Sequence, residues 1–118
     1  MKVTVAATQF ACTPIPAENI ARAESMVRQA AAKGAQVILL QELFETPYFC
    51  KDHLVSHFEL AHPLPDNAVL RHFQALAKEL GVVLPVSVFE RANNAYYNSL
   101  AMVDADGEVL GVYRKSHI

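Results

Sequence analysis

A strand, a helix and a second strand are predicted within the first 40 residues, and this order restricts the fold more than any other feature of the chain. Val3–Thr8 has the composition of a strand. Apolar residues then recur at helical spacing, with Arg22 and Glu24 among the polar residues of the opposite face. Val37–Leu40 is apolar throughout, as expected for a strand covered on both faces. We therefore predict a right-handed βαβ unit in an α/β fold.

Both predicted helices have recognisable ends. The first opens within Pro14–Glu18, where proline suits the first turn and an acidic side chain favours the positive end of the helix dipole. Gly34 suits the left-handed position that ends it. The second helix begins at Asp66 or Asn67, either of which can cap it, and ends at Gly81. Its apolar stripe consists of Val69, Leu70, Phe73, Leu76, Ala77 and Leu80.

Three further strands are predicted at Val82–Phe89, Tyr97–Val103 and Val109–Tyr113. The last two are joined by aspartate and glycine residues that favour a turn, so they form a hairpin. Pro85 lacks the amide that a central strand donates, and we expect a bulge or an unpaired position there. His53–Ala61 is ambiguous and is compatible with one short helix.

Composition restricts the class of protein. The chain has 118 residues, of which 53% are hydrophobic, and this suits about one small globular domain. The formal net charge of −2 argues against a nucleic-acid binder, which needs a basic surface. No apolar stretch reaches the roughly 18 to 20 residues that span a bilayer, and Met1–Val5 does not have the pattern of a secretory signal. We expect a cytoplasmic protein with reduced thiols.

Glu42 and Lys115 each follow an apolar run that is predicted to be a strand. Because two strand ends can open on the same edge of a sheet, the carboxylate and the ammonium can meet in one pocket. Such a pair supplies a general base and a charge stabiliser, which are two of the three parts of an acyl-transfer site. Taken singly, each residue is more often an ordinary solvated side chain.

The third part of an acyl-transfer site is a nucleophile, and this sequence offers no convincing candidate for it. Cys12 and Cys50 have no nearby histidine or helix N-terminus that would lower the thiol pKa, so we interpret both as small apolar fillers. His53 and His57 have a spacing that could hold zinc, but they lack the glutamate and the third ligand of a zinc site. We predict neither a metal nor a cofactor. His117 lies on the same side as Lys115 if the last strand continues.

The sequence stops at Ile118, just beyond the last predicted strand, and the sheet would have one uncovered face and one uncovered edge. We therefore expect these residues to be the front part of a larger chain. Alternate residues of Val82–Val88 and Asn98–Val103 would then expose apolar surface to water when residues 1–118 stand alone.

The order of elements and four sequence blocks resemble the N-terminal part of the nitrilase (carbon–nitrogen hydrolase) superfamily. The blocks are Gln41–Cys50, Gly81–Ser87, Phe89–Arg91 and Tyr113–His117, and within the superfamily they are most similar to the N-carbamoylputrescine amidases. The resemblance implies that residues 1–118 are the first half of a four-layer α-β-β-α sandwich, with one sheet and two helices. The nucleophilic cysteine of the single hydrolase domain would lie beyond Ile118.

The resemblance also implies roles for individual residues. Glu42 would take a proton from the cysteine, and Lys115 would stabilise the oxyanion. Tyr48 and His117 are assigned to substrate binding. The implied reaction converts N-carbamoylputrescine to putrescine, carbon dioxide and ammonia in polyamine biosynthesis, and these 118 residues alone would be inactive. The implied partner is a small ureido or amide substrate, with neither nucleic acid nor membrane, and a homo-oligomer is expected.

Other functions stay open on the sequence. One is a different amidase or carbamoylase of the superfamily, acting on N-carbamoyl amino acids or β-ureidopropionate. A second is a non-catalytic α/β module, although Thr8–Thr13 has neither the glycine loop nor the acidic pocket of a flavodoxin-like domain. A third is a segment that serves only to assemble with a missing half.

Overall fold

The computed structural model describes all 118 residues and contains two α-helices and five β-strands. In chain order these are β1 (Val5–Ala7), α1 (Pro16–Ala32), β2 (Val37–Leu39), α2 (Ala68–Leu80), β3 (Leu84–Ala92), β4 (Ala95–Val103) and β5 (Val109–Arg114). Two 3₁₀ helices, Phe49–Lys51 and Val55–Leu60, lie between β2 and α2. Every helix and strand predicted above is present, and the α/β class is confirmed.

The βαβ unit at the start of the chain is confirmed. β1 and β2 pair in parallel, with Val5 opposite Val37. Pro16 occupies the first turn of α1, where its missing amide leaves no intrahelical bond unmade. Gly34 follows the end of this helix with a φ of +95°, a conformation that glycine adopts without steric cost.

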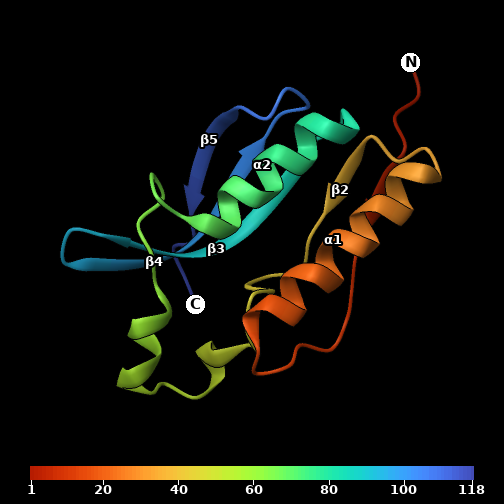
Figure 1. Ribbon diagram of the computed structural model, residues 1–118. Helices are drawn as coiled ribbons and strands as arrows, with labels where there is room; N and C mark the ends of the chain where they lie inside the picture. The colour runs from red at the N-terminus through yellow and green to blue at the C-terminus, as the bar shows by residue number, and fades with distance from the viewer.

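The predicted sheet layer is divided into two sheets, which Figure 1 shows behind the helices. β1 and β2 form a parallel pair, and β3, β4 and β5 form an antiparallel sheet with β4 in the middle. One parallel bridge between Val37 and Val83 joins the two. The Ile38 amide donates to the Val83 carbonyl at 3.0 Å, so β2 and β3 lie next to each other.

The expected irregularity at Pro85 is wrong. β3 and β4 pair without a shift from Leu84 opposite Val103 to Ala92 opposite Ala95, and Pro85 lies within this ladder. β3 is an edge strand of the three-stranded sheet, where the missing amide of a proline is tolerated. The register shift instead occurs between β4 and β5, next to Met102.

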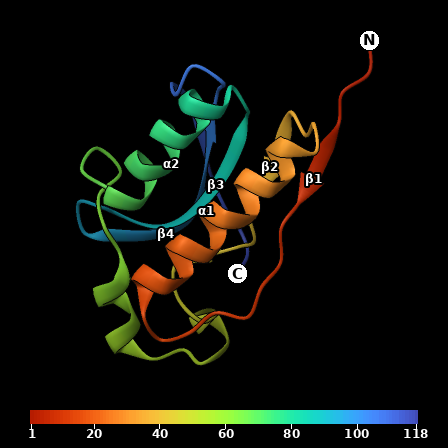
Figure 2. The same ribbon diagram turned by 45° about the vertical axis from the view of Figure 1, so that its right-hand side comes forward.

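Both helices cover the same face of the strands, as Figures 1 and 2 show. The core lies between them and the strands, where Phe73 of α2 meets Phe44 edge-on with 5.2 Å between ring centroids. The predicted cap of α2 is confirmed, because the Asn67 side chain accepts a hydrogen bond from the Leu70 amide at 2.9 Å. Gly81 ends this helix with a φ of +65°.

The opposite face of the strands is open to solvent. Val5, Leu39 and Tyr113 are 70%, 45% and 62% exposed. The expectation that Val37–Leu40 would be covered on both faces is therefore wrong: Ile38 is fully buried under the helices, but its neighbour Leu39 faces outward. Leu100 and Met102 of β4 are half-buried, so β4 contributes to the uncovered face as expected.

β3 does not contribute to that open face in the way the sequence predicted. Its alternate residues Pro85 and Ser87 are buried. The segment after β2 folds over this part of the strand, and the Leu43 amide donates to the Ser87 hydroxyl at 2.8 Å.

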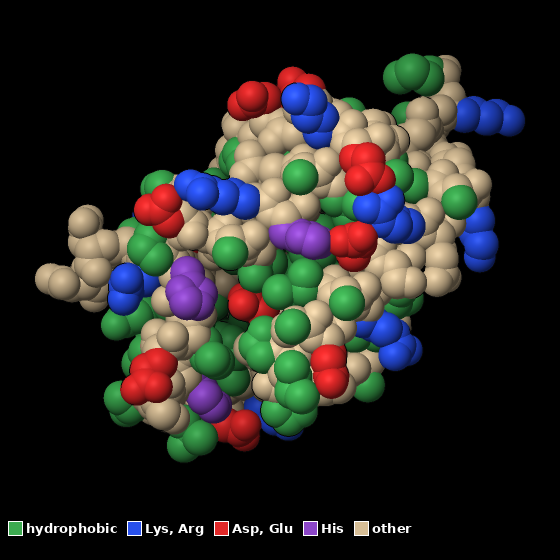
Figure 3. All heavy atoms as spheres, in the orientation of Figure 1, with side chains coloured by type: hydrophobic (Ala, Val, Ile, Leu, Met, Phe, Trp, Pro, Cys, Tyr) green, Lys and Arg blue, Asp and Glu red, His purple; other side chains and the backbone are tan.

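The helical face is hydrophilic, with acidic, basic and histidine side chains close together in Figure 3. Arg28 of α1 donates to Glu24 on its own helix and to Glu79 of α2. His72 of α2 also contacts Glu24. These pairs link the outer surfaces of the two helices. Neither helix combines the length and the apolar character needed to cross a membrane.

Candidate active site

Glu42 lies in a turn at the carboxyl end of β2 that is anchored on both sides. Before it, the Gln41 side-chain amide accepts from the Phe10 amide at 2.8 Å and donates to the Phe10 carbonyl at 3.0 Å. After it, the Leu43 amide donates to Ser87. Leu43 has a φ of +50°, which is a strained conformation for a branched side chain. The turn therefore holds Glu42 in a defined place at some conformational cost.

Lys115 is anchored in a similar way at the end of β5. The preceding residue, Arg114, forms two hydrogen bonds with the buried Glu90, at 2.9 and 2.8 Å. The Lys115 amide donates to the Asn98 carbonyl of β4 at 2.9 Å. Because adjacent residues of an extended chain point to opposite faces, Arg114 lies on the helical side and Lys115 on the open side.

The structure brings Glu42 and Lys115 together, although 73 positions separate them. The Lys115 ammonium donates to Oε1 of Glu42 at 2.8 Å. The Asn98 side-chain amide donates to the same oxygen at 2.6 Å. Glu42 is thus the acceptor of two donors that come from β4 and from the end of β5.

These contacts set the charge state of the pair. The ammonium of Lys115 holds the pKa of Glu42 below its usual value, and the Asn98 amide acts in the same direction, while partial burial opposes both. The carboxylate raises the pKa of Lys115 in return. At neutral pH the site therefore contains an ionised carboxylate, able to accept a proton, beside a fixed positive charge.

The pair lies in a hollow of about 420 Å³ on the open face. Its walls come from the ends of β2 and β5 and from the middle of β3 and β4, and include Leu39, Ser87, Leu100 and Tyr113. The Glu42 and Lys115 side chains are 41% and 37% exposed in this part of the protein. No second layer covers this face here, so water reaches the pair.

Tyr48 lies near the pair, whereas His117 does not contact it. Partial burial raises the pKa of Tyr48, and the negative charge of Glu42 acts in the same direction. The prediction for His117 required β5 to continue past Lys115, but the strand ends at Arg114. His117 is exposed in the segment after the strand, and no hydrogen bond joins it to the pair.

The two cysteines differ in their surroundings. Burial raises the pKa of the Cys12 thiol, which donates to the Phe44 carbonyl at 3.3 Å, so Cys12 is a poor nucleophile. Cys50 lies closer to the candidate site than the sequence suggested, near enough to contribute to the raised pKa of both Tyr48 and Lys115. Cys50 also lines an apolar hollow of about 320 Å³ beside the site, which shares Asn98 with it.

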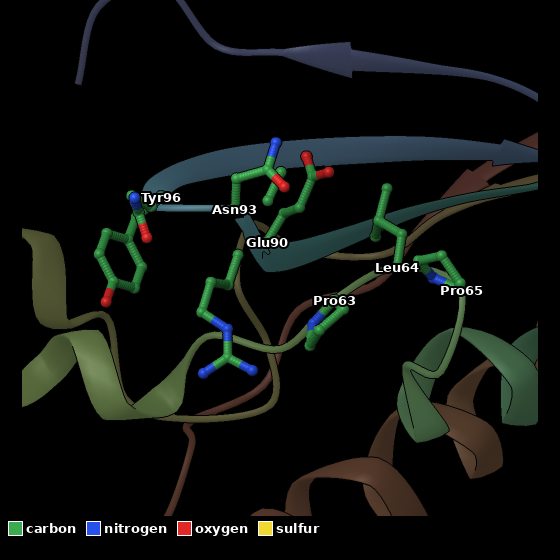
Figure 4. Close-up of a pocket in the computed structure, with 9 residues that line it drawn as sticks. Pro63, Leu64, Pro65, Glu90, Asn93 and Tyr96 are labelled. Atoms are coloured by element: carbon green, nitrogen blue, oxygen red, sulfur yellow. The ribbon is translucent and has the colours of Figure 1, made fainter.

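A larger hollow, of about 850 Å³, lies away from the pair on the helical side of β3 and β4. Figure 4 shows Glu90, Asn93 and Tyr96 on one side of it and the segment Pro63–Pro65 across from them. Glu90 is its only acidic residue, and that carboxylate already accepts hydrogen bonds from Arg114 and Ser99. This hollow therefore offers no free base or nucleophile.

Asn98 and Gln41 are the site residues that the sequence reasoning missed. Asn98 is 4% exposed and is the only amide side chain of β4, between Tyr97 and Ser99. A buried amide needs a partner, and this is the signal that could have identified it. Gln41 precedes Glu42 directly, but nothing in its spacing indicates its contact with Phe10.

Comparison with known proteins identifies the family of this chain. The family model described as carbon-nitrogen hydrolase matches residues 4–118. The chain belongs to the carbon–nitrogen hydrolase family. The resemblance to the nitrilase superfamily noted in the sequence is therefore confirmed.

The similar proteins are longer than this chain. It is 56% identical over 117 residues to a protein of Oryza sativa subsp. japonica named N-carbamoylputrescine amidase, covering 99% of the chain and 39% of that relative. It is 45% identical over 116 residues to a citrullinase of Francisella tularensis, covering 98% of the chain and 41% of the relative. The chain thus spans about two fifths of the length of these curated relatives.

A solved structure supports the fold as well. The crystal structure of a carbon-nitrogen hydrolase from Helicobacter pylori superposes with a TM-score of 0.88 at 33% identity, covering 98% of this chain and 40% of the other. The arrangement of strands and helices described here is therefore part of the fold of the nitrilase superfamily.

Proposed function

We propose that residues 1–118 are the N-terminal part of a single carbon–nitrogen hydrolase domain that uses Glu42, Lys115 and a cysteine beyond Ile118. The contact between Glu42 and Lys115 carries this proposal, because it sets an ionised base and a fixed positive charge side by side. The open hollow around the pair leaves room for a nucleophile from the remaining sequence. Tyr48 and His117 are proposed to contact the substrate.

The chemistry follows from these charges. Glu42 takes the thiol proton, and the thiolate attacks the carbonyl carbon of a terminal urea. Lys115 stabilises the oxyanion of the tetrahedral intermediate, a contribution that can reach roughly 3 to 4 kcal/mol for a well-placed donor. Collapse of the intermediate expels ammonia, which takes the proton from Glu42, and leaves an N-alkylcarbamoyl thioester.

Water completes the reaction. Glu42 accepts a proton from a water molecule that attacks the thioester, and the thiolate leaves as the second tetrahedral intermediate collapses and takes this proton back from Glu42. The released carbamic acid loses carbon dioxide and yields the free amine. One water molecule is consumed in the hydrolysis, and the amine, carbon dioxide and ammonia are the products.

The substrate class we propose is a terminal urea on an alkyl chain, with N-carbamoylputrescine as the specific candidate. Relatives at 54% to 59% identity over nearly the whole chain are named N-carbamoylputrescine amidase, and these names support the choice. The relative named citrullinase supports a second candidate of the same class, because citrulline is also a terminal urea. We further propose a role in polyamine biosynthesis, a cytoplasmic location and a homo-oligomeric assembly.

The test uses the full-length protein and measures ammonia release from N-carbamoylputrescine and from citrulline. Glu42→Gln and Lys115→Ala should each lower kcat by about two orders of magnitude or more without changing the thermal midpoint. Glu108→Gln and Lys33→Ala, which change exposed residues of the same types, serve as matched controls and should keep full activity. Activity retained in Glu42→Gln would disprove the proposed role of the carboxylate.

The position of the nucleophile needs a separate experiment, because Cys50 lies near Lys115. We expect residues 1–118 alone to release no ammonia, and Cys50→Ala to keep the activity of the full-length protein. Ammonia release by residues 1–118 that disappears in Cys50→Ala would place the nucleophile within this chain instead.

A further inference from the structure

Asn98 joins the two charged residues of the candidate site. Its side-chain amide donates to Oε1 of Glu42 at 2.6 Å, and its carbonyl accepts from the Lys115 amide at 2.9 Å. Asn98 itself is 4% exposed and lies within β4, opposite Phe89 of β3. One buried residue on a regular strand therefore fixes both the orientation of the carboxylate and the backbone from which the lysine projects.

The two oxygens of the Glu42 carboxylate are not equivalent. Oε1 accepts from the Lys115 ammonium at 2.8 Å and from the Asn98 amide, so both of its lone pairs are occupied. No donor within residues 1–118 reaches Oε2. We infer that Asn98 is a positioning residue, which turns the carboxylate so that Oε2 is the atom that accepts the proton of the nucleophile; this inference rests on the proposed function.

The acidity of Glu42 gives this inference a measurable consequence. Hydrogen bonds to the charged form of a carboxyl group favour that form, and removing one raises the pKa. The other ionisable groups near Glu42 are Lys115 at the end of β5, and Tyr48 and Cys50 in the segment after β2. A substitution at Asn98 leaves these three groups in place. A shift in the acid limb of the pH profile of kcat/KM therefore indicates the loss of the hydrogen bond from the Asn98 amide to Glu42.

The experiment compares two variants at Asn98 with a buried asparagine elsewhere, in the full-length protein with N-carbamoylputrescine. Asn98→Ala removes the donor, and Asn98→Asp keeps the shape of the side chain but replaces the donor with a like charge. Asn67→Ala is the matched control, because Asn67 is 2% exposed and caps α2 without contacting the site. The pH dependence of kcat/KM, kcat at its optimum and the thermal midpoint are measured for each.

Asn98→Ala should lower kcat by about tenfold or more, the effect expected for losing one hydrogen bond to a charged group, with a smaller change in KM. The acid limb of kcat/KM should move to higher pH, and it should move further in Asn98→Asp because two carboxyl groups then compete for one proton. Asn67→Ala should lower the thermal midpoint and leave the acid limb in place.

An unchanged acid limb in both Asn98 variants would overturn the inference, as would an equal shift in Asn67→Ala. If Asn98→Ala does not fold, Asn98→Asp decides the question, and a titration of the Glu42 carboxyl carbon by NMR gives its pKa without an activity assay. Glu42→Gln separates this inference from the proposed function. An active Glu42→Gln refutes the function, whereas an inactive Glu42→Gln combined with unshifted Asn98 variants refutes only the role of Asn98.

Discussion

Glu90 and Arg114 form a partly buried ion pair whose removal should affect stability in an uneven way. The Glu90 side chain is 5% exposed and accepts two hydrogen bonds from Arg114 and one, at 2.8 Å, from the Ser99 hydroxyl. The Arg114 side chain is 46% exposed and lies over the Tyr97 ring, 4.0 Å from its centroid. The carboxylate therefore depends on its partner, while the guanidinium also has access to water.

This asymmetry predicts the order of the two single substitutions. Arg114→Met leaves a buried carboxylate with Ser99 as its one donor and should cost about 3 kcal/mol, the lower end of the range for breaking a buried pair, because Arg114 is half-exposed. Glu90→Gln leaves a guanidinium that water can solvate, and should cost about 1.5 to 3 kcal/mol for the weakened charged hydrogen bonds. The double substitution Glu90→Leu with Arg114→Met should recover at least about 1 kcal/mol of the summed losses.

Lowering the pH should reduce the loss of stability that Arg114→Met causes. Arg114, and then Ser99, hold the pKa of Glu90 below its usual value of about 4.3. A carboxyl group whose pKa is lowered in the folded state contributes stability above the unfolded pKa, and this contribution is lost as the pH falls through the folded pKa. The wild type therefore loses this contribution on acidification, and the difference between wild type and Arg114→Met should shrink below about pH 4.

The measurement is urea unfolding of the full-length protein, followed by circular dichroism at pH 7 and at about pH 3, below the unfolded pKa of a glutamate, for the wild type, the single variants and the double variant. An Arg114→Met variant that costs less than Glu90→Gln would contradict the reasoning, because it would mean that the carboxylate is well solvated without its partner. The same conclusion would follow if the difference in unfolding free energy between the wild type and Arg114→Met did not change with pH.

Three other substitutions can be tested by the same unfolding measurements, and the exposed apolar face can be tested by dye binding. Phe73→Ala should cost about 3 to 5 kcal/mol because this ring is fully buried against Phe44. Gly81→Ala should cost roughly 1 kcal/mol, since its φ of +65° is unfavourable for a residue with a Cβ; a neutral or stabilising effect would contradict this. Asn67→Ala should cost about 1 kcal/mol through the lost cap of α2. Residues 1–118 alone should bind a hydrophobic dye on the face that carries Leu39, and a sharp reversible thermal transition without dye binding would argue against this.

The elements of this fold that could be predicted from the sequence are those set by neighbouring residues. Asn67 and Gly81 define both ends of α2 through contacts within one turn, and the sequence shows both of them. The hairpin of β4 and β5 follows from a turn between two apolar runs. The turn that joins β3 to β4 has an equally local signal, the pair of asparagines at 93 and 94, and Asn93 adopts a φ of +54°.

The features that could not be predicted depend on contacts between distant segments. Leu39 is exposed because no layer covers that face here, and an apolar run of four residues does not indicate which of its faces is covered. Ser87 is buried because the segment around Leu43 crosses it, 44 positions away in sequence. His117 was placed by alternation along a strand, but β5 ends at Arg114 and Lys115 is the last residue whose amide bonds to β4, so alternation does not extend to His117.

The meeting of Glu42 and Lys115 requires more than the two strand ends that predicted it. Both side chains are more than a third exposed, and an ion pair in that setting contributes at most about 1 kcal/mol, too little to position two chain segments. The neighbouring residues supply the missing constraint: Gln41 binds the backbone of Phe10 before Glu42, and Arg114 binds the buried Glu90 before Lys115. Since each charged residue follows an anchor directly, a substitution at an anchor should disturb the pair geometry even when both charges are kept. The positions of the two charges are therefore a property of the anchored backbone, and their mutual attraction adjusts only the last few ångströms.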